Sequence, residues 1–104
     1  MQRQVGDRVG EAVTLTNIGL AWDDLGEPRQ ALEYYEQALP IRRAVGDRGG
    51  EATTLNNMAS IFYADGDLDK ALEYFEQALV IVRAVGAVQD VALYLGNIGA
   101  LLRY

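Results

Sequence analysis

The stretch ALEYYEQAL at residues 31–39 recurs as ALEYFEQAL at residues 71–79, with a single substitution. The two copies lie 40 residues apart, and the same offset links GDR at 6–8 with GDR at 46–48. Chance does not produce such agreement, so the chain is built from a repeated unit. A period of this length is typical of arrays of helical repeats.

Each unit has the pattern of two helices, because apolar residues recur at three- and four-residue spacing along one helical face. No alternating pattern typical of a strand competes with this spacing. In the first unit, the first half carries Ala12, Leu15, Ile18, Gly19, Trp22 and Leu25, and the second half carries Ala31, Leu32, Tyr35, Ala38, Leu39 and Val45.

Glycine and proline mark the ends of the predicted helices. Gly26 is expected to end the first helix in a left-handed conformation, and Pro28 suits the first position of the next helix. Gly46 and Gly66 are expected to act like Gly26, and the Asp that follows each of them is an expected N-cap. The predicted helices are 8–25, 28–45, 48–65, 68–85 and 88–104.

The composition excludes several classes of function. The 104 residues contain no cysteine and no histidine, which removes thiolate chemistry, zinc–thiolate sites and the commonest general base. The net charge of −6 disfavours nucleic acids and anionic membrane surfaces as partners. The chain shows neither a membrane-spanning apolar run nor a signal peptide. We expect a cytoplasmic protein that is not an enzyme and needs no cofactor or metal.

One motif resembles a calcium loop but fails on inspection. Asp65, Asp67 and Asp69, followed by Glu76, have the carboxylate spacing of an EF-hand. The sixth position of that loop requires glycine for its turn, and this chain has Lys70 there. We therefore interpret the segment as a turn between helices.

The spacing of apolar and small residues resembles the tetratricopeptide repeat, whose pattern runs large apolar, Leu-Gly, aromatic, Gly, Ala, aromatic, Ala. The period departs from the usual unit of about 34 residues. The longer unit is similar to Leu-Gly-Asn repeats and to kinesin-light-chain-like repeats. The matching residues are Leu15, Ile18, Gly19, Trp22, Gly26, Ala31, Tyr35 and Ala38, then Leu55, Met58, Ala59, Phe62, Gly66, Ala71, Phe75 and Ala78, then Leu95, Ile98, Gly99 and Leu102.

The resemblance implies an all-α superhelix, a solenoid of about two and a half helix-turn-helix repeats with five antiparallel helices. Within one domain at 1–104, residues 1–5 would end a preceding repeat. Repeats would then occupy 6–45 and 46–85, and 86–104 would form the first helix of a third. It further implies a scaffold or adaptor that binds a peptide or partner helix in the concave groove.

By match to the family pattern, the groove is lined by the first helix of each unit. Tyr63 is the best single anchor, because tyrosine combines a rigid ring with a polar tip. Asp23 and Asp24, two acidic residues at one end of the predicted groove, suggest a partner with basic character. The alternative is that the face is ordinary solvated surface. The predicted groove residues are Val13, Thr16, Leu20, Asp23 and Asp24, then Thr53, Asn56, Ser60, Tyr63 and Ala64, then Leu93, Gly96, Ala100, Arg103 and Tyr104.

Asn17, Asn57 and Asn97 recur at one position of the unit. In related repeats such an asparagine can bond the backbone of a bound peptide, since its amide both donates and accepts. The alternative is a bond to the backbone of the neighbouring repeat, which the residues alone favour.

The last predicted helix carries apolar residues that no following helix covers, and exposed apolar patches of this kind mark association sites. Two explanations stay open: a piece of a longer array, or a homo-oligomer joined through this end. The alternative function is therefore a self-assembling or engineered repeat fragment without a natural ligand. The predicted self-association residues are Tyr94, Leu95, Ile98, Leu101 and Leu102.

Overall fold

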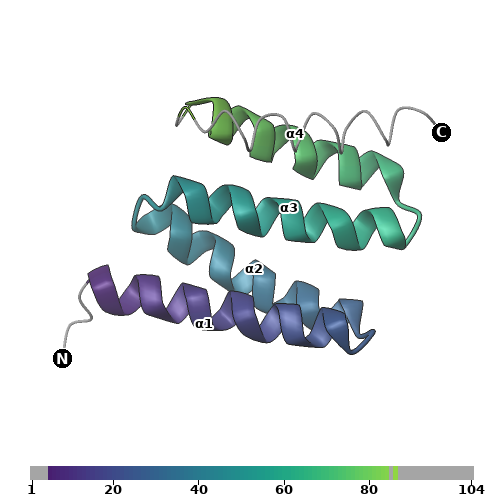
Figure 1. Ribbon diagram of the computed structural model, residues 1–104, viewed down its shortest axis with the longest axis horizontal. Helices are drawn as coiled ribbons and strands as arrows, with labels where there is room; N and C mark the ends of the chain where they lie inside the picture. Colours follow the sequence, from purple (N-terminus) through teal and green to yellow (C-terminus); the bar gives the residue numbers. More distant parts are fainter. Residues whose placement is uncertain (1–4, 85, 87–104) are drawn as a thin grey trace. The chain divides into compact units, whose positions relative to one another are not determined.

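The computed structural model describes residues 5–84 and 86, and this part of the chain is all-α (Figure 1). It contains α1 (Val5–Asp24), α2 (Pro28–Ala44), α3 (Arg48–Ala64) and α4 (Leu68–Ala84). These bounds lie within three residues of the predicted ones, which confirms the helical-repeat class. The predicted fifth helix, 88–104, lies outside the described residues.

The chain divides into two compact units, Met1–Asp47 and Arg48–Tyr104. In the first unit α1 packs side by side with α2, and in the second α3 packs with α4, each pair joined by a tight turn (Figure 1). Each unit is therefore one helical hairpin. The division falls two residues after the repeat boundary that the sequence predicts.

The turns confirm the role predicted for glycine. Gly26, Gly46, Gly66 and Gly86 all have φ between 75° and 84°, a region that other residues rarely adopt. At the first turn, the Gly26 amide donates to the Asp23 carbonyl at 3.0 Å and the next amide donates to the Trp22 carbonyl at 2.9 Å. This pair of bonds is a Schellman motif, which satisfies two carbonyls at the end of α1.

The helix starts also follow the sequence signals. Pro28 is the first residue of α2, where its missing amide hydrogen costs nothing. The Asp67 carboxylate accepts a bond from the Lys70 amide at 3.2 Å, so Asp67 caps α4 as predicted. Asp47, the predicted N-cap of α3, directly precedes that helix, and its carboxylate accepts a bond from Arg42.

Small residues let the helices of each pair approach closely. Ala12, Ala31 and Ala38 are fully buried in the first unit. In the second unit, Ala59 and Ala71 are fully buried with Phe75 as a core cluster. No helix in the described part of the chain is long and apolar enough to cross a membrane.

In the first unit Gly19 lies directly against the ring of Tyr35, which is fully buried. A Cβ atom added at Gly19 would lie 2.6 Å from Cε1 and 2.9 Å from Cδ1 of that ring. No side chain fits there without movement. In the second unit the equivalent residues are Ala59 and Phe75, so the second unit has a methyl group where Gly19 has none and a ring without a hydroxyl where Tyr35 has one.

Replacing Gly19 with alanine is expected to lower the free energy of unfolding by about 1–2 kcal/mol. Overpacking costs about 1–3 kcal/mol and outweighs the helix-propensity gain of at most about 1 kcal/mol. Gly10→Ala is the matched control, because a Cβ there meets nothing within 4 Å. It should stabilise the chain by about 0.5–1 kcal/mol. Urea unfolding followed by circular dichroism measures both, and equal effects would contradict the predicted clash.

Candidate functional site

The longest uninterrupted run of differences between the two copies of the repeat is one variable segment in the first helix, and shorter differences lie elsewhere, as at residues 27–30. Every residue from 18 to 25 differs from its equivalent between 58 and 65. By contrast, Glu33, Tyr34, Glu36 and Gln37 on the second helix return unchanged 40 residues later. Because the fold is the same in both units, it does not dictate the residues of the variable segment. The second halves of α1 and α3, together with the first turns of α2 and α4, therefore give the two units different surfaces.

One face of α1 presents an exposed stripe, which we call the α1 stripe: Val13, Asn17, Leu20 and Asp24. These residues follow four-, three- and four-residue spacing, so they lie above one another on the helix. Val13 is 41% exposed and Leu20 is 39% exposed, while Asp23 beside the stripe is also exposed. The stripe thus combines apolar area, an amide and an acidic end.

The corresponding face of α3 carries Thr53, Asn57, Ser60 and Ala64, with Tyr63 beside them. The Thr53 and Ser60 hydroxyls donate to the carbonyls four residues earlier, at 3.0 Å and 3.1 Å, so each is left mainly as an acceptor. Tyr63 is 36% exposed and is the aromatic side chain on this face. Asn56 is half-buried.

The recurring asparagines occupy different environments. Asn17 is exposed and Asn57 is half-buried. Within the described part of the chain, neither amide group makes a hydrogen bond. Both alternatives stated for this position therefore stay predictions.

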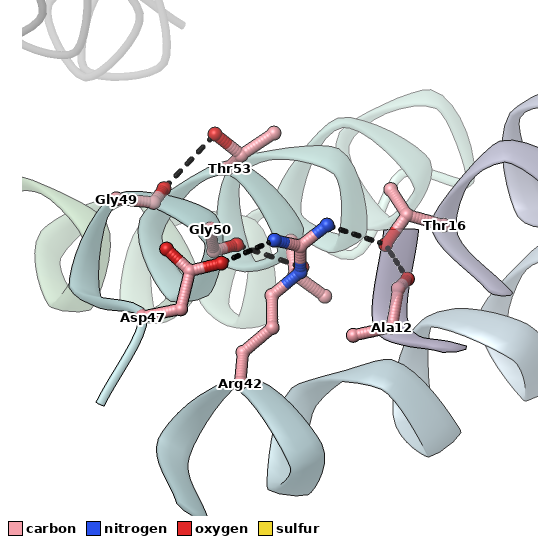
Figure 2. A network of polar contacts seen from close by, with 8 residues as sticks. Ala12, Thr16, Arg42, Asp47, Gly49, Gly50 and Thr53 are labelled. Atoms are coloured by element: carbon pink, nitrogen blue, oxygen red, sulfur yellow. Dashed lines mark hydrogen bonds and ion pairs between the residues drawn. The ribbon is translucent and has the colours of Figure 1, made fainter. Parts of the chain in front are cut away.

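Thr16 departs from its predicted place at the groove. It is only 5% exposed, and its hydroxyl donates to the Ala12 carbonyl at 2.8 Å. The same oxygen accepts a bond from Nη2 of Arg42 at 3.2 Å (Figure 2). With its hydroxyl occupied inside the first unit, Thr16 is not available to contact a partner, and we leave it out of the proposed surface.

Arg42 is the centre of this buried network. Its Nη1 atom lies 2.7 Å from the Asp47 carboxylate, with side chains 9% and 31% exposed respectively (Figure 2). The guanidinium therefore joins the end of α2 to α1 and to the residue before α3. Nε of Arg42 is buried and has no partner among the described residues.

Sequence reasoning missed this network, although one signal pointed to it. Arg42 follows Tyr35, Ala38 and Leu39 at the spacing of the buried face, and its equivalent in the second unit is the buried Val82. A long side chain at a core position needs a polar partner at its tip. The arginine is consequently structural and not part of the exposed surface.

The end of α1 concentrates negative charge. Asp23 and Asp24 are exposed in its last turn, which holds no basic residue, and neither carboxylate forms an ion pair within the described residues. The buried Tyr35 hydroxyl has no hydrogen-bond partner in this part of the chain. Burial, together with Asp23 and Asp24, raises the pKa of Tyr35 to about 12.

Several predicted residues lie outside the described residues, and their roles stay predictions. They are Asn97, the groove residues Leu93, Gly96, Ala100, Arg103 and Tyr104, and the self-association residues Tyr94, Leu95, Ile98, Leu101 and Leu102. Among the residues that are described, no three or more acidic side chains are placed to hold a metal ion.

Comparison with known families gives two matches over the chain. One model described as a tetratricopeptide repeat matches residues 12–47, and another with the same description matches residues 50–104. The second match covers more than half of the chain. No curated protein matches the chain.

Proposed function

Because the chain belongs to the tetratricopeptide repeat family, a family of non-catalytic modules for protein–protein interaction, we propose that it is a scaffold or adaptor. It binds a peptide or partner helix along the exposed faces of the first helices, the groove that the family resemblance implies. The finer resemblance to Leu-Gly-Asn and kinesin-light-chain-like repeats stays a prediction.

The observation that carries this proposal is the uninterrupted run of substitutions at residues 18–25. It changes the exposed first-helix residues Leu20 and Asp23 to Ser60 and Tyr63 in the next copy, whereas the exposed second-helix residues Glu33 and Glu36 recur. A surface that varies while its scaffold repeats is suited to recognising a partner at defined positions. Exposed apolar and aromatic side chains on that surface supply the area that binding requires.

The first experiment is a selection of 12-residue peptides from a random display library against the whole chain. We expect enriched peptides that share a motif and bind saturably at micromolar affinity. Trp22 is the single tryptophan and lies within the variable segment, so its fluorescence provides a direct titration signal. A selection without any enriched motif would contradict a peptide-binding function.

Two substitutions test whether the enriched peptides use the proposed faces. Tyr63→Ala is expected to weaken binding about tenfold, which is the usual cost of truncating a central aromatic contact. Leu20→Ser, which installs the residue of the other copy, should weaken it about threefold without harming the fold. Isothermal titration calorimetry with a selected peptide measures both effects.

The matched control is Val80→Ala on α4, because Val80 is 65% exposed and belongs to a second helix. Its affinity for the same peptide is expected to stay within twofold of the parent chain. If Val80→Ala weakened binding as much as Tyr63→Ala, the contact face would be the second helices, and the proposed site would be wrong.

A further inference from the structure

The nine-residue stretch at 31–39 and its copy at 71–79 differ at one position only, and that position is buried in both units. Tyr35 of the first unit is replaced by Phe75 in the second. The residue against which the Tyr35 ring packs, Gly19, is also replaced, by Ala59. The single substitution in this stretch therefore accompanies a substitution on the other helix of the pair.

The same holds for the rest of the core that the two units share. Among the positions buried in both units, only 19, 35 and 42 change their residue between the copies. Gly19 and Tyr35 lie against each other, and Arg42 donates to the Thr16 hydroxyl at 3.2 Å (Figure 2). Thr16 is replaced as well, by Asn56. The changes thus fall on contacting pairs, each with one residue on α1 and one on α2. The positions buried in both units that keep their residue are Ala12, Ala31, Ala38, Leu39 and Ile41.

We propose that these two pairs, Gly19 with Tyr35 and Thr16 with Arg42, keep each second helix on the first helix of its own unit. We call them the pairing determinants. The unchanged core residues would let either second helix pack on either first helix, a hazard of chains built from near-identical repeats. This inference concerns how the helices find their partners, and it does not depend on the proposed function.

Each crossed helix pair would meet a packing mismatch. If α2 packed on α3, the Tyr35 ring would meet the Cβ atom of Ala59. The first unit shows the consequence, since a Cβ atom at Gly19 would lie 2.6 Å from Cε1 of Tyr35, closer than such atoms approach. If α4 packed on α1, Phe75 would lie over Gly19 and leave a gap where the second unit has a methyl group. Overpacking and gaps both destabilise a close-packed core.

The Thr16–Arg42 pair adds a directional contact to this selection. The Arg42 side chain is only 9% exposed, so its guanidinium needs acceptors inside the protein. Asp47 is close to Arg42 in sequence and would accompany it to any helix, whereas Thr16 belongs to α1. The helix α4 cannot make the same bond, because it carries Val82 at the equivalent position. Buried polar pairs of this kind can fix which helices associate and in which register.

The determinants also restrict how two copies of the chain can exchange helices. An exchange in register, with α2 of one copy on α1 of another, keeps both pairs matched. An exchange out of register, with α2 of one copy on α3 of another, breaks them. We therefore expect the pairing determinants to suppress the out-of-register exchange specifically.

The first test asks whether Gly19 and Tyr35 are matched to each other. In the parent chain, Gly19→Ala is expected to raise the equilibrium constant of unfolding about 5–30-fold. In the Tyr35→Phe background the same substitution should leave that constant unchanged or lower it, because the second unit packs Ala59 with Phe75 in one core cluster. Urea unfolding followed by circular dichroism measures all four chains. An equal effect in both backgrounds would overturn the proposal.

The second test removes the difference between the units and looks for crossed pairing. After refolding from urea at high concentration, the parent chain should give one set of amide signals in nuclear magnetic resonance spectra. The substituted chain should give a second set with about a tenth or more of the total intensity. Its substitutions install the residues of the second copy: Thr16→Asn, Gly19→Ala, Tyr35→Phe and Arg42→Val.

The matched control makes the two units equally more alike but leaves the pairing determinants intact. It carries the same number of substitutions, each to the residue of the second copy and each at an exposed position of the first unit. This chain should give one set of signals, like the parent. Its substitutions are Leu20→Ser, Asp23→Tyr, Arg29→Asp and Gln30→Lys.

Either of two results in the second test would overturn the proposal: one set of signals from the chain without pairing determinants, or equally doubled signals from the control. If the chain with four substitutions does not fold, Gly19→Ala with Tyr35→Phe takes its place. That chain repeats a residue pair that the second unit already packs, and the same two results decide.

Discussion

Replacing Asp47 with alanine is expected to lower the free energy of unfolding by about 3 kcal/mol. The substitution leaves the Arg42 guanidinium, in a side chain only 9% exposed, without its carboxylate partner. Removing one member of a buried ion pair costs about 3–5 kcal/mol, and the partial exposure of Asp47 places this case at the lower end. Urea unfolding followed by circular dichroism provides the measurement.

A double-mutant cycle isolates the ion pair from the other roles of Asp47. The sequence also predicts Asp47 as the N-cap of α3, and losing such a cap costs about 1 kcal/mol. Arg42→Val installs the residue that occupies the buried equivalent position 82. In the Arg42→Val background, Asp47→Ala should cost only about 1 kcal/mol, giving a coupling of about 2 kcal/mol.

Two results would contradict this account of the network. If Asp47→Ala cost the same in both backgrounds, Arg42 would not depend on Asp47 for its charge compensation. If Arg42→Val destabilised the chain more than Asp47→Ala, packing of the arginine stem would outweigh its charge. Neither substitution should disturb the hydrogen bond that the Thr16 hydroxyl donates to the Ala12 carbonyl.

Above pH 10 the chain is expected to lose about 2–3 kcal/mol of stability through Tyr35 alone. Its folded-state pKa is about 12, compared with an ordinary value of 10.0. Below pH 10 the hydroxyl is neutral in both states, so Tyr35 adds no pH dependence there. Between pH 10 and pH 12 the unfolded chain releases the proton first, and stability falls until the folded state also ionises.

The substitution Tyr35→Phe provides the comparison, and the second unit already has Phe75 at the equivalent position. At pH 7 it should leave stability unchanged or raise it by up to about 1 kcal/mol, because a buried hydroxyl without a partner is removed. The stability difference between the two chains should then widen with pH from 10 to 12. A difference that stays constant across this range would mean that the Tyr35 hydroxyl is not buried in solution.

Replacing Asp23 and Asp24 with asparagine tests the causes of the raised pKa of Tyr35. Neutralising both carboxylates removes two of the three causes that raise the pKa of Tyr35, so its alkaline transition should move below pH 12. Burial remains, and the pKa should stay above its ordinary value. The size of this decrease would measure how much the two carboxylates contribute to the raised pKa of Tyr35.

The backbone of the described residues followed from the sequence because its signals are local. The positive φ at Gly26, Gly46 and Gly66 and the Asp67 cap act within a few residues of each helix end. The apolar period then fixes which face of each helix is buried. Turn residues and the apolar period depend only on positions close together in the sequence, so the helix bounds and the all-α fold class could be predicted from the sequence alone.

The side chains were harder to place, as Thr16 and Arg42 show. Both lie on the buried faces of their helices, yet the family pattern assigned Thr16 to the groove. Their hydrogen bond joins residues 26 positions apart, and the spacing of apolar residues along the chain does not predict which side chains of two helices will meet. Leu20, Asp23 and Tyr63 are exposed, and their contact with a partner is a proposal.

The sequence by itself determined the repeat, the glycine turns, the four described helices and the family, because each depends on spacing along the chain. Only the tertiary structure decided that Arg42 is buried against Thr16 and Asp47, that Gly19 admits the Tyr35 ring, and that the Tyr35 hydroxyl has no partner among the described residues. These features depend on which atoms of different helices meet within a few ångströms, and packing alone sets those distances.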